Sequence, residues 1–357
     1  MHHVILFLMA CGALIGGVDR MLGNRLGLGE KFEEGFRLLG SVALCQAGMI
    51  CVAPLLSALL GPVITPVFRF FRVDPAMAGA ILAIDMGGYQ MAEQLAADAL
   101  IGRFSGIVAA SMLGCTLTYT IPVGTGLIPE GLQSAFARGT MCGLIALPFA
   151  LIPAGLACGI PWMVLLLCCL PVLILSFLLA FLLLRFPVRA IRFFRIFARA
   201  VRGITTLGLA LGAFQSLSGL TLLRVLAPLE EAMAVVSSIG IALLGSLPLA
   251  ELLRRALHRP MQRLGDRIGV GERGMTGMLI AAINITPALV SLREMDERSA
   301  TLTAAFAVSG ASALTAHLGF AASLAPEMVG PMLLGKFAGA FLAAALAWGM
   351  TRRYQTN

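Results

Sequence analysis

Long apolar stretches separated by short polar connections run through almost the whole chain. Seven of them contain no Asp, Glu, Lys or Arg: 38–68, 104–129, 139–184, 203–223, 232–250, 274–292 and 299–326. A helix needs roughly 20 apolar residues to cross a bilayer. The longest stretch, 139–184, has room for two such helices, with Gly159-Ile160-Pro161 at the turn between them.

This pattern predicts an all-α, polytopic integral membrane protein with about 11 transmembrane helices. The expected spans are 4–18, 38–63, 75–97, 104–125, 139–159, 161–184, 203–222, 232–250, 274–292, 299–323 and 327–350. The first is expected to be a span and not a secretory signal, because it lacks a preceding basic segment and a small-x-small cleavage site.

Composition supports the membrane class. Apolar residues make up 59% of the 357 residues and charged residues 12%, with a mean hydropathy of +0.93, whereas a soluble chain carries about 25% charged residues. The eight cysteines lie in apolar runs without a CxxC pair, and no HExxH, GxSxG or Walker-A motif occurs. The sequence therefore predicts no metal site, no cofactor and no enzyme.

The net charge of +8 comes mainly from arginines in two connections, 185–202 and 254–273. Arg-rich connections mark the cytoplasmic side of a membrane protein. Four phenylalanines in the first connection also suit a helix at the membrane surface. The predicted partner of these basic segments is the lipid bilayer, and not a nucleic acid.

The chain also repeats itself with an offset of about 196 residues. Glu33-Glu34-Gly35-Phe36 returns as Glu230-Glu231-Ala232-Met233. Further matches in the same order are Gly12 and Gly16 with Gly208 and Gly212, Gly48 with Gly245, Met77-Ala78-Gly79 with Met275-Thr276-Gly277, and Gly139 and Gly143 with Gly335 and Gly339. Transporters often consist of duplicated halves. We predict a first five-helix repeat at 1–159, a linker helix and basic loop at 160–202, and a second five-helix repeat with a short tail at 203–357.

Charge also predicts how the two halves are oriented. The segments Arg69–Arg72 and Arg254–Arg273 follow equivalent spans, and both are basic. If both are cytoplasmic, the halves are parallel, related by an axis along the membrane normal. Eleven full crossings would then leave the Arg352-Arg353 tail outside, against the charge rule, and a re-entrant segment would remove this conflict.

Ionisable groups within spans are candidates for function because they are costly inside a membrane. Asp85 leads them, and Gly87 and Gly88 beside it favour an unwound stretch. The equivalent stretch of the second half, 283–287, is interrupted by Pro287. Broken segments at corresponding positions of two halves point to a transport site. The alternative is that Asp85 caps a half-helix or pairs with a nearby base.

In the transport-site interpretation, Asp85 supplies a carboxylate for an ammonium group. Gln90, Asn284 and Thr286 supply neutral donors and acceptors for a hydroxyl group. His317 is either a satisfied hydrogen-bonding group within the helix bundle or a direct contact of the substrate.

Other charged and polar residues have two interpretations each. Lys336 lies well inside the last span, and it either extends to the interface or pairs with a buried acid such as Asp85. Asp19 and Gln215 occupy equivalent span ends and are further candidates for a buried ion pair or a gate. The acids that begin the second and eighth spans either complement a helix dipole or form a cation-attracting vestibule: Glu33, Glu34, Glu230 and Glu231.

Several motifs resemble the EutH-type ethanolamine permeases, which are inner-membrane proteins of bacterial ethanolamine utilisation. In the family's order over essentially the whole chain, they are Phe32-Glu33-Glu34-Gly35-Phe36, Gly61-Pro62-Val63-Ile64, Asp85-Met86-Gly87-Gly88, His317-Leu318-Gly319-Phe320-Ala321-Ala322 and Gly335-Lys336. The resemblance implies a permease for ethanolamine in a bacterial inner membrane. Ile283 and Ala316 depart from the family's pattern, which tends to have an asparagine and an acid there, so a related amine is an alternative substrate.

The other functions that remain open are a permease for another small polar metabolite, a channel, and a membrane-embedded enzyme. An enzyme would turn over its substrate in detergent, whereas a transporter shows activity only across a sealed membrane. The sequence decides neither the coupling ion nor whether the chain forms a homo-oligomer.

Overall fold

The computed structural model describes residues 2–82 and 85–353, and at Asp85 it describes the backbone alone. All regular secondary structure in these residues is helical, so the predicted all-α class is confirmed. Eight helices are long and apolar enough to cross a membrane, which makes the chain a multi-pass membrane protein. Their outward faces carry large apolar side chains, such as Phe70 and Leu217, that suit contact with lipid.

The eight candidate spans include most of the predicted segments. They are α1 (His2–Met21), α2 (Leu28–Phe70), the α5–α7 segment (Ala99–Leu127), α8 (Glu130–Ala157), α9 (Trp162–Arg185), α10 (Pro187–Ser218), α11 (Leu229–Ile268) and α16 (Val329–Arg353). The remaining three predicted segments, 75–97, 274–292 and 299–323, are interrupted. They account for the difference from the expected count of about 11.

The first interrupted segment is a helical hairpin. It consists of α3 (Met77–Ile81), the 3-10 turn η1 (Asp85–Gly87) and α4 (Gly88–Leu95). Its two arms touch at glycines, since a Cβ on Gly79 would lie 2.6 Å from the Gly88 carbonyl oxygen. At its base, the Asp74 carboxylate accepts hydrogen bonds from the backbone N–H groups of Ala97 (3.2 Å) and Asp98 (2.9 Å). The chain therefore enters and leaves this hairpin at the same end.

The second interrupted segment is also a hairpin. It consists of α12 (Glu272–Ile283), α13 (Ile285–Ser291) and the 3-10 turn η4 (Leu292–Glu294). Asn284 separates the two helices with an extended backbone, φ −148° and ψ 121°, and its side chain caps α13 by accepting from the Thr286 N–H at 3.0 Å. The Arg273 guanidinium closes the base by donating to the Glu294 carbonyl oxygen.

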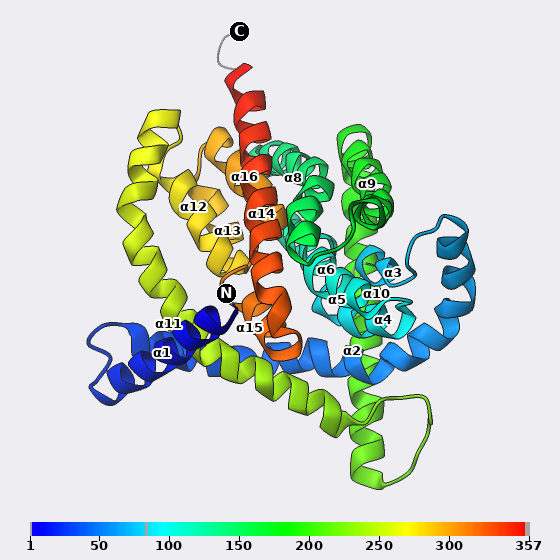
Figure 1. Cartoon of the computed structure of the whole chain (residues 1–357). Coiled ribbons are helices and arrows are strands. Elements are labelled where there is room, and N and C mark those ends of the chain that lie inside the picture. The colour runs from blue at the N-terminus through cyan, green and yellow to red at the C-terminus, as the bar shows by residue number, and fades with distance from the viewer. Residues whose placement is uncertain (1, 83–84, 354–357) are drawn as a thin grey trace.

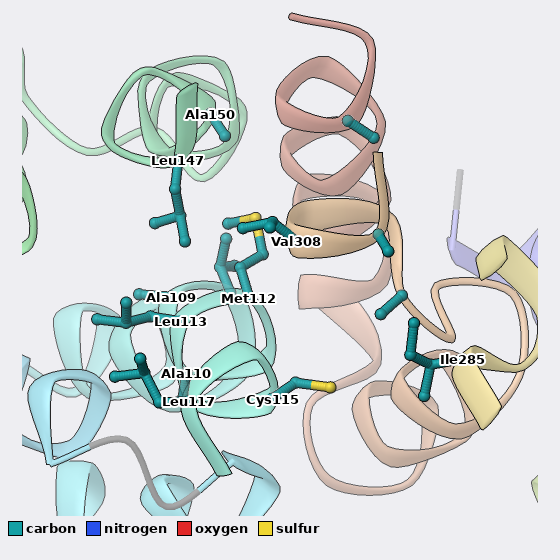
Figure 2. Packing of buried hydrophobic residues seen from close by; sticks show 14 of the residues in the cluster. Ala109, Ala110, Met112, Leu113, Cys115, Leu117, Leu147, Ala150, Ile285 and Val308 are labelled. Atoms are coloured by element: carbon teal, nitrogen blue, oxygen red, sulfur yellow. The ribbon is translucent and has the colours of Figure 1, made fainter. Parts of the chain in front are cut away.

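Two further segments cross the core of the molecule beside the hairpins. One runs through α5 (Ala99–Arg103), η2 (Phe104–Ala109), α6 (Ala110–Cys115), η3 (Thr116–Thr120) and α7 (Ile121–Leu127), with η2 and η3 in π-helical form. The other consists of α14 (Glu297–Gly310), an unwound stretch at 311–315, α15 (Ala316–Leu324) and η5 (Pro326–Met328). Both pack close to α8 and α16, as Figures 1 and 2 show for α6, α8 and α14.

Helices that the repeat makes equivalent run antiparallel. Along α8 and α16, Arg138 and Met350 border one cavity, whereas Cys158 Sγ lies 3.6 Å from Met328 Sδ at the opposite ends. Along α2 and α11, Lys31 borders a cavity with Arg254. Parallel halves would make equivalent helices run in the same direction, so the expected parallel orientation is wrong. The arginines at 69–72 are too few to establish on which side of the membrane that connection lies.

The basic segment 254–273 and the arginine tail lie at the same end of the molecule. A cavity of about 510 Å³ is lined by Arg138, Gly269, Asp296, Glu297, Arg298, Met350 and Thr351. The end of α16 therefore lies beside the end of α11, at the same end as the basic segment 254–273 (Figure 1). The arginine tail thus agrees with the charge rule, because the α12–α13 hairpin replaces one of the three crossings predicted between the segment 254–273 and the tail.

Glycines permit the closest helix crossings. Gly12 of α1 packs on Gly245 of α11, and Gly208 of α10 packs on Gly48 of α2, so closely that any Cβ there would overlap the opposite backbone. Each crossing joins a helix of one half to a helix of the other, and the two crossings match at the offset of the repeat.

Candidate functional site

The candidate site begins where two interrupted helices cross. The Ser312 and Leu314 N–H groups donate to the carbonyl oxygens of Ala281 (2.8 Å) and Ala282 (2.9 Å), and the Ser312 hydroxyl lies 3.4 Å from the Ile285 nitrogen. Ser312 itself adopts the left-handed conformation, with φ 49°. Unwound backbone inside a membrane must find hydrogen-bond partners, and these two breaks supply them to each other. The result is a fixed, polar crossing point.

The tip of the second hairpin is also tied to the first half of the chain. The Tyr119 hydroxyl, from the π-helical stretch η3, shares a hydrogen bond of 2.7 Å with the Thr286 hydroxyl. One turn earlier, the Thr116 hydroxyl donates to the Val308 carbonyl oxygen at 3.0 Å. The sequence analysis missed Tyr119 and Thr116. The signal for them was the run 116–120, in which four of five residues carry a hydroxyl inside a charge-free stretch.

Lys336 is fully buried, and its ammonium donates to the Ser111 carbonyl oxygen at 2.9 Å. The expectation that it extends to the membrane interface is therefore wrong. Ser111 belongs to α6, which packs directly against η1, the turn that begins at Asp85. The Asp85 side chain lies outside the described residues, as do Ala83 and Ile84, so the predicted pairing of Asp85 with Lys336 stays a prediction.

Two glutamines, Gln90 of the first hairpin and Gln46 of α2, have buried polar atoms without a hydrogen-bond partner among the described residues. Within the described part of the chain, Gln90 Oε1 on α4 and both polar side-chain atoms of Gln46 on α2 are buried without a hydrogen-bond partner. Helix α2 packs against α4 and η1. Buried polar groups are nearly always hydrogen-bonded, so a polar ligand beside the first hairpin would satisfy the Gln90 amide oxygen. Gln90 was predicted, whereas Gln46 was missed because a single Gln in an apolar run gives no pattern.

His317 begins α15 immediately after the unwound stretch. It is buried, and its Nδ1 lies 2.9 Å from the Ala311 carbonyl oxygen. This hydrogen bond holds the imidazole against the break, next to Ser312 and Thr315. A direct contact with substrate stays a prediction for this residue.

Asp19 and Gln215 lie in the last turns of α1 and α10, where their side chains bond to the connections that follow. The buried Asp19 carboxylate accepts from the backbone N–H groups of Leu26, Leu28 and Gly29 at 2.8–2.9 Å, which fixes the turn between α1 and α2. Gln215 Oε1 accepts from the Leu223 N–H at 2.9 Å in the equivalent connection after α10. Their hydrogen bonds identify them as loop-stabilising residues.

The four predicted vestibule acids do not share one cavity. Glu34 borders a cavity of about 240 Å³ together with Asn284, and the lining of that cavity includes none of the other three. Glu33 instead pairs with Arg20 and Arg37 on the surface, and Glu230 accepts from Ser216. Among the described residues, no group of three or more His, Cys, Asp or Glu side chains is placed to hold a metal ion.

Comparisons with known proteins agree on one family. Residues 1–350 match the family model described as ethanolamine utilisation protein, EutH. The chain is 35% identical to a probable ethanolamine permease of Listeria monocytogenes over 99% of this chain and 95% of that protein. It is 34% identical to a probable ethanolamine permease of Salmonella typhimurium, over 97% and 94% of the two chains. It is 36% identical to a Bacillus subtilis protein named uncharacterized, over 98% and 95%. No solved structure matches the chain.

Proposed function

Since this chain belongs to the EutH family of ethanolamine utilisation proteins, we propose that it is a permease that takes up protonated ethanolamine across a bacterial inner membrane. The observation that carries this proposal is the crossing of two interrupted helices beside a second, acid-bearing hairpin. Interrupted helices of this kind form the binding sites of many transporters, because they expose polar backbone at membrane depth.

The proposed architecture is a pair of inverted halves. The antiparallel arrangement of α2 with α11 and of α8 with α16 supports this orientation. In it, the eight candidate spans and the interrupted α14–α15 segment cross the membrane. The α3–α4 hairpin enters from the outside, and the α12–α13 hairpin enters from the cytoplasm. The two matched glycine crossings support the same symmetry.

The proposed site lies between the two hairpin tips. Asp85 would balance the substrate's ammonium, and the unsatisfied amides of Gln90 and Gln46 lie on helices beside it. Asn284 and Thr286 would receive the hydroxyl group, which would insert between the Tyr119 and Thr286 hydroxyls and bond to both. A carboxylate and a neutral donor–acceptor pair are the minimum that a small amino alcohol requires.

The charge of the substrate explains why a protein is needed. An alkyl ammonium group has a pKa of roughly 10, like that of Lys, so the cation dominates at neutral pH. The neutral amine crosses lipid unaided, whereas the cation pays a large desolvation cost. If the cation moves alone, a membrane potential that is negative inside favours entry by about 2.3 kcal/mol per 100 mV. No second ion is then required.

The test is uptake of radiolabelled ethanolamine by proteoliposomes. At pH near 6, we expect saturable uptake that an interior-negative potassium diffusion potential accelerates. At pH near 8.5, passive entry into protein-free vesicles should hide most of the difference. Uptake no faster than in protein-free vesicles at pH near 6 would exclude ethanolamine. Testing other small amines in the same vesicles then addresses the alternative raised by Ile283 and Ala316.

A further inference from the structure

A cavity of about 240 Å³ with four charged side chains in its lining opens beside the tip of the second hairpin. Its lining includes Lys31 and Glu34 of α2, Glu251 and Arg254 of α11, and Ile283 and Asn284 of the hairpin. Asn284 is the residue at which α12 and α13 separate. The cavity therefore connects the proposed substrate site with a ring of paired charges, and it lies between the two halves of the chain.

The two ion pairs in this cavity differ in how firmly they are held. Glu251 accepts three hydrogen bonds, from Arg254 Nε (2.7 Å), Arg254 Nη2 (2.8 Å) and Arg255 Nε (2.7 Å), and its side chain is 10% exposed. Such charge-assisted, bidentate contacts are strong and directional. This acid is a fixed part of the wall.

The pair between Lys31 and Glu34 is much looser. A single contact of 2.6 Å joins Lys31 Nζ to Glu34 Oε2, one turn apart on α2, and the two side chains are 34% and 31% exposed. Partly exposed pairs at this spacing contribute little to stability and exchange readily. Lys31 also ends in a primary alkyl ammonium, which is the same chemical group that the substrate carries. The two cations can therefore compete for one carboxylate.

We propose that the Lys31–Glu34 pair is the inner gate of the transport path, and that the departing ammonium opens it by replacing Lys31 on Glu34. This inference rests on the proposed function for the identity of the cation. The cavity belongs to the inner side because Arg254 begins the basic segment 254–273, which the charge rule places in the cytoplasm. Glu251 holds the opposite wall in place while the Lys31 side chain swings away.

The test uses a cysteine at Ile283, which lines the cavity and has no role in the proposed substrate contacts. Ile283→Cys is labelled with a membrane-impermeant cationic thiol reagent in inside-out and in right-side-out vesicles. The protein without this substitution gives the background from its eight native cysteines. We expect labelling from the inner face only, and labelling from the outer face alone would overturn the proposal.

Lys31→Met then removes the movable cation in the Ile283→Cys protein. Without the Lys31 side chain in the lining of the cavity, labelling should be about fivefold faster, as expected for the loss of one partly exposed pair. The matched control is Arg37→Met, which breaks the 2.9 Å pair of Arg37 with Glu33 on the same helix but outside the cavity. Equal labelling rates in the Lys31→Met and Arg37→Met proteins would overturn the gate.

A final arm tests the competing cation. Ethanolamine at the inner face should accelerate labelling of Ile283→Cys, and Glu34→Gln should abolish this response, because it removes the carboxylate for which the two cations compete. A response that persists in Glu34→Gln would overturn the role of Glu34. If Lys31→Met accelerates labelling while proteoliposomes show no ethanolamine uptake, the gate stands and the proposed substrate fails.

Discussion

The two hairpins occupy places that the predicted repeat makes equivalent, yet they are held in different ways. The α3–α4 hairpin is fixed at its base, where the Asp74 carboxylate binds three backbone N–H groups. The α12–α13 hairpin is fixed at its tip, through the Asn284 cap and the backbone bonds to 311–315. The second hairpin thus carries a hydrogen-bonding framework at its tip, near Asn284, whereas the sequence places an acid, Asp85, at the turn of the first.

The α5–α7 and α14–α15 segments, which follow the two hairpins, also differ in how their backbone groups are hydrogen-bonded. At the offset of the repeat, Thr116 matches Ser312. The chain at 116–120 widens into a π-helix, whereas the chain at 311–315 leaves the helix altogether. A π-helical stretch keeps its backbone bonds within the segment, but an unwound stretch must bond elsewhere. The predicted repeat therefore aligns two breaks of different kinds, a π-helical stretch at 116–120 and an unwound stretch at 311–315.

The largest effect should come from removing that acid. We expect Asp85→Asn to reduce ethanolamine uptake to the level of protein-free vesicles, because a neutral amide leaves the substrate cation unbalanced in a low-dielectric site, at a cost of several kcal/mol. Asp98→Asn is the matched control. Asp98 caps α5 by accepting from the Leu100 N–H at 2.8 Å, and Asn caps equally well. Comparable uptake by the two variants would show that the first hairpin does not supply the charge.

The next effect tests whether the two halves are built alike. Ala at Gly48 or at Gly245 would overlap the opposite backbone, of Thr205 and Met9 respectively. Overpacking typically costs about 1–3 kcal/mol, so each substitution should lower the melting temperature in detergent by a similar amount. Gly40→Ala is the control on α2, since a Cβ there would meet no atom of the described chain within 4 Å. A strong effect at only one of the two crossings would contradict the proposed symmetry.

The sequence predicted the positions of the helices along the chain better than it predicted which segments form hairpins. Charge-free stretches locate the helices because lipid accepts any apolar face, and Gly87, Gly88 and Pro287 mark segments that are interrupted. Hydropathy does not distinguish a full crossing from a hairpin of the same length, since both need apolar surfaces. The orientation of the halves was missed for this reason, because it depends on the parity of the crossings.

The residues of the candidate site were also predicted only in part. Asn284 and Thr286 were predicted from the break that contains them. Tyr119 and Ser312 were not, because each reaches the crossing point from a segment distant in sequence. The role of a single polar residue in an apolar run can be assigned only when its hydrogen-bond partners are known. Lys336 is an example, since only its contact with Ser111 shows that it stays inside the protein.

A smaller effect should separate the two roles of Asn284. Asn284→Ala removes both the cap of α13 and a candidate substrate contact, and losing a cap typically costs about 1 kcal/mol of stability. Asn284→Ser keeps a capping oxygen but shortens the side chain. We expect the serine variant to melt close to the parent protein while its KM for ethanolamine rises. If uptake follows the melting temperature in both variants, Asn284 acts only on the scaffold.

The smallest effect should come from the Tyr119–Thr286 hydrogen bond, which joins the two halves of the chain. Tyr119→Phe removes the hydroxyl that shares a 2.7 Å hydrogen bond with Thr286. A neutral hydrogen bond contributes about 0.5–1.5 kcal/mol, so we expect a KM for ethanolamine that is about threefold to tenfold higher, with a nearly unchanged maximal rate. Tyr89→Phe is the control, because the Tyr89 ring contact with Phe320, with centroids 5.9 Å apart, survives the change. Simple alkyl amines sharpen the test: lacking a hydroxyl, they should be taken up equally by the parent and by Tyr119→Phe. An equal loss for ethanolamine and ethylamine would mean that Tyr119 only holds the two halves together.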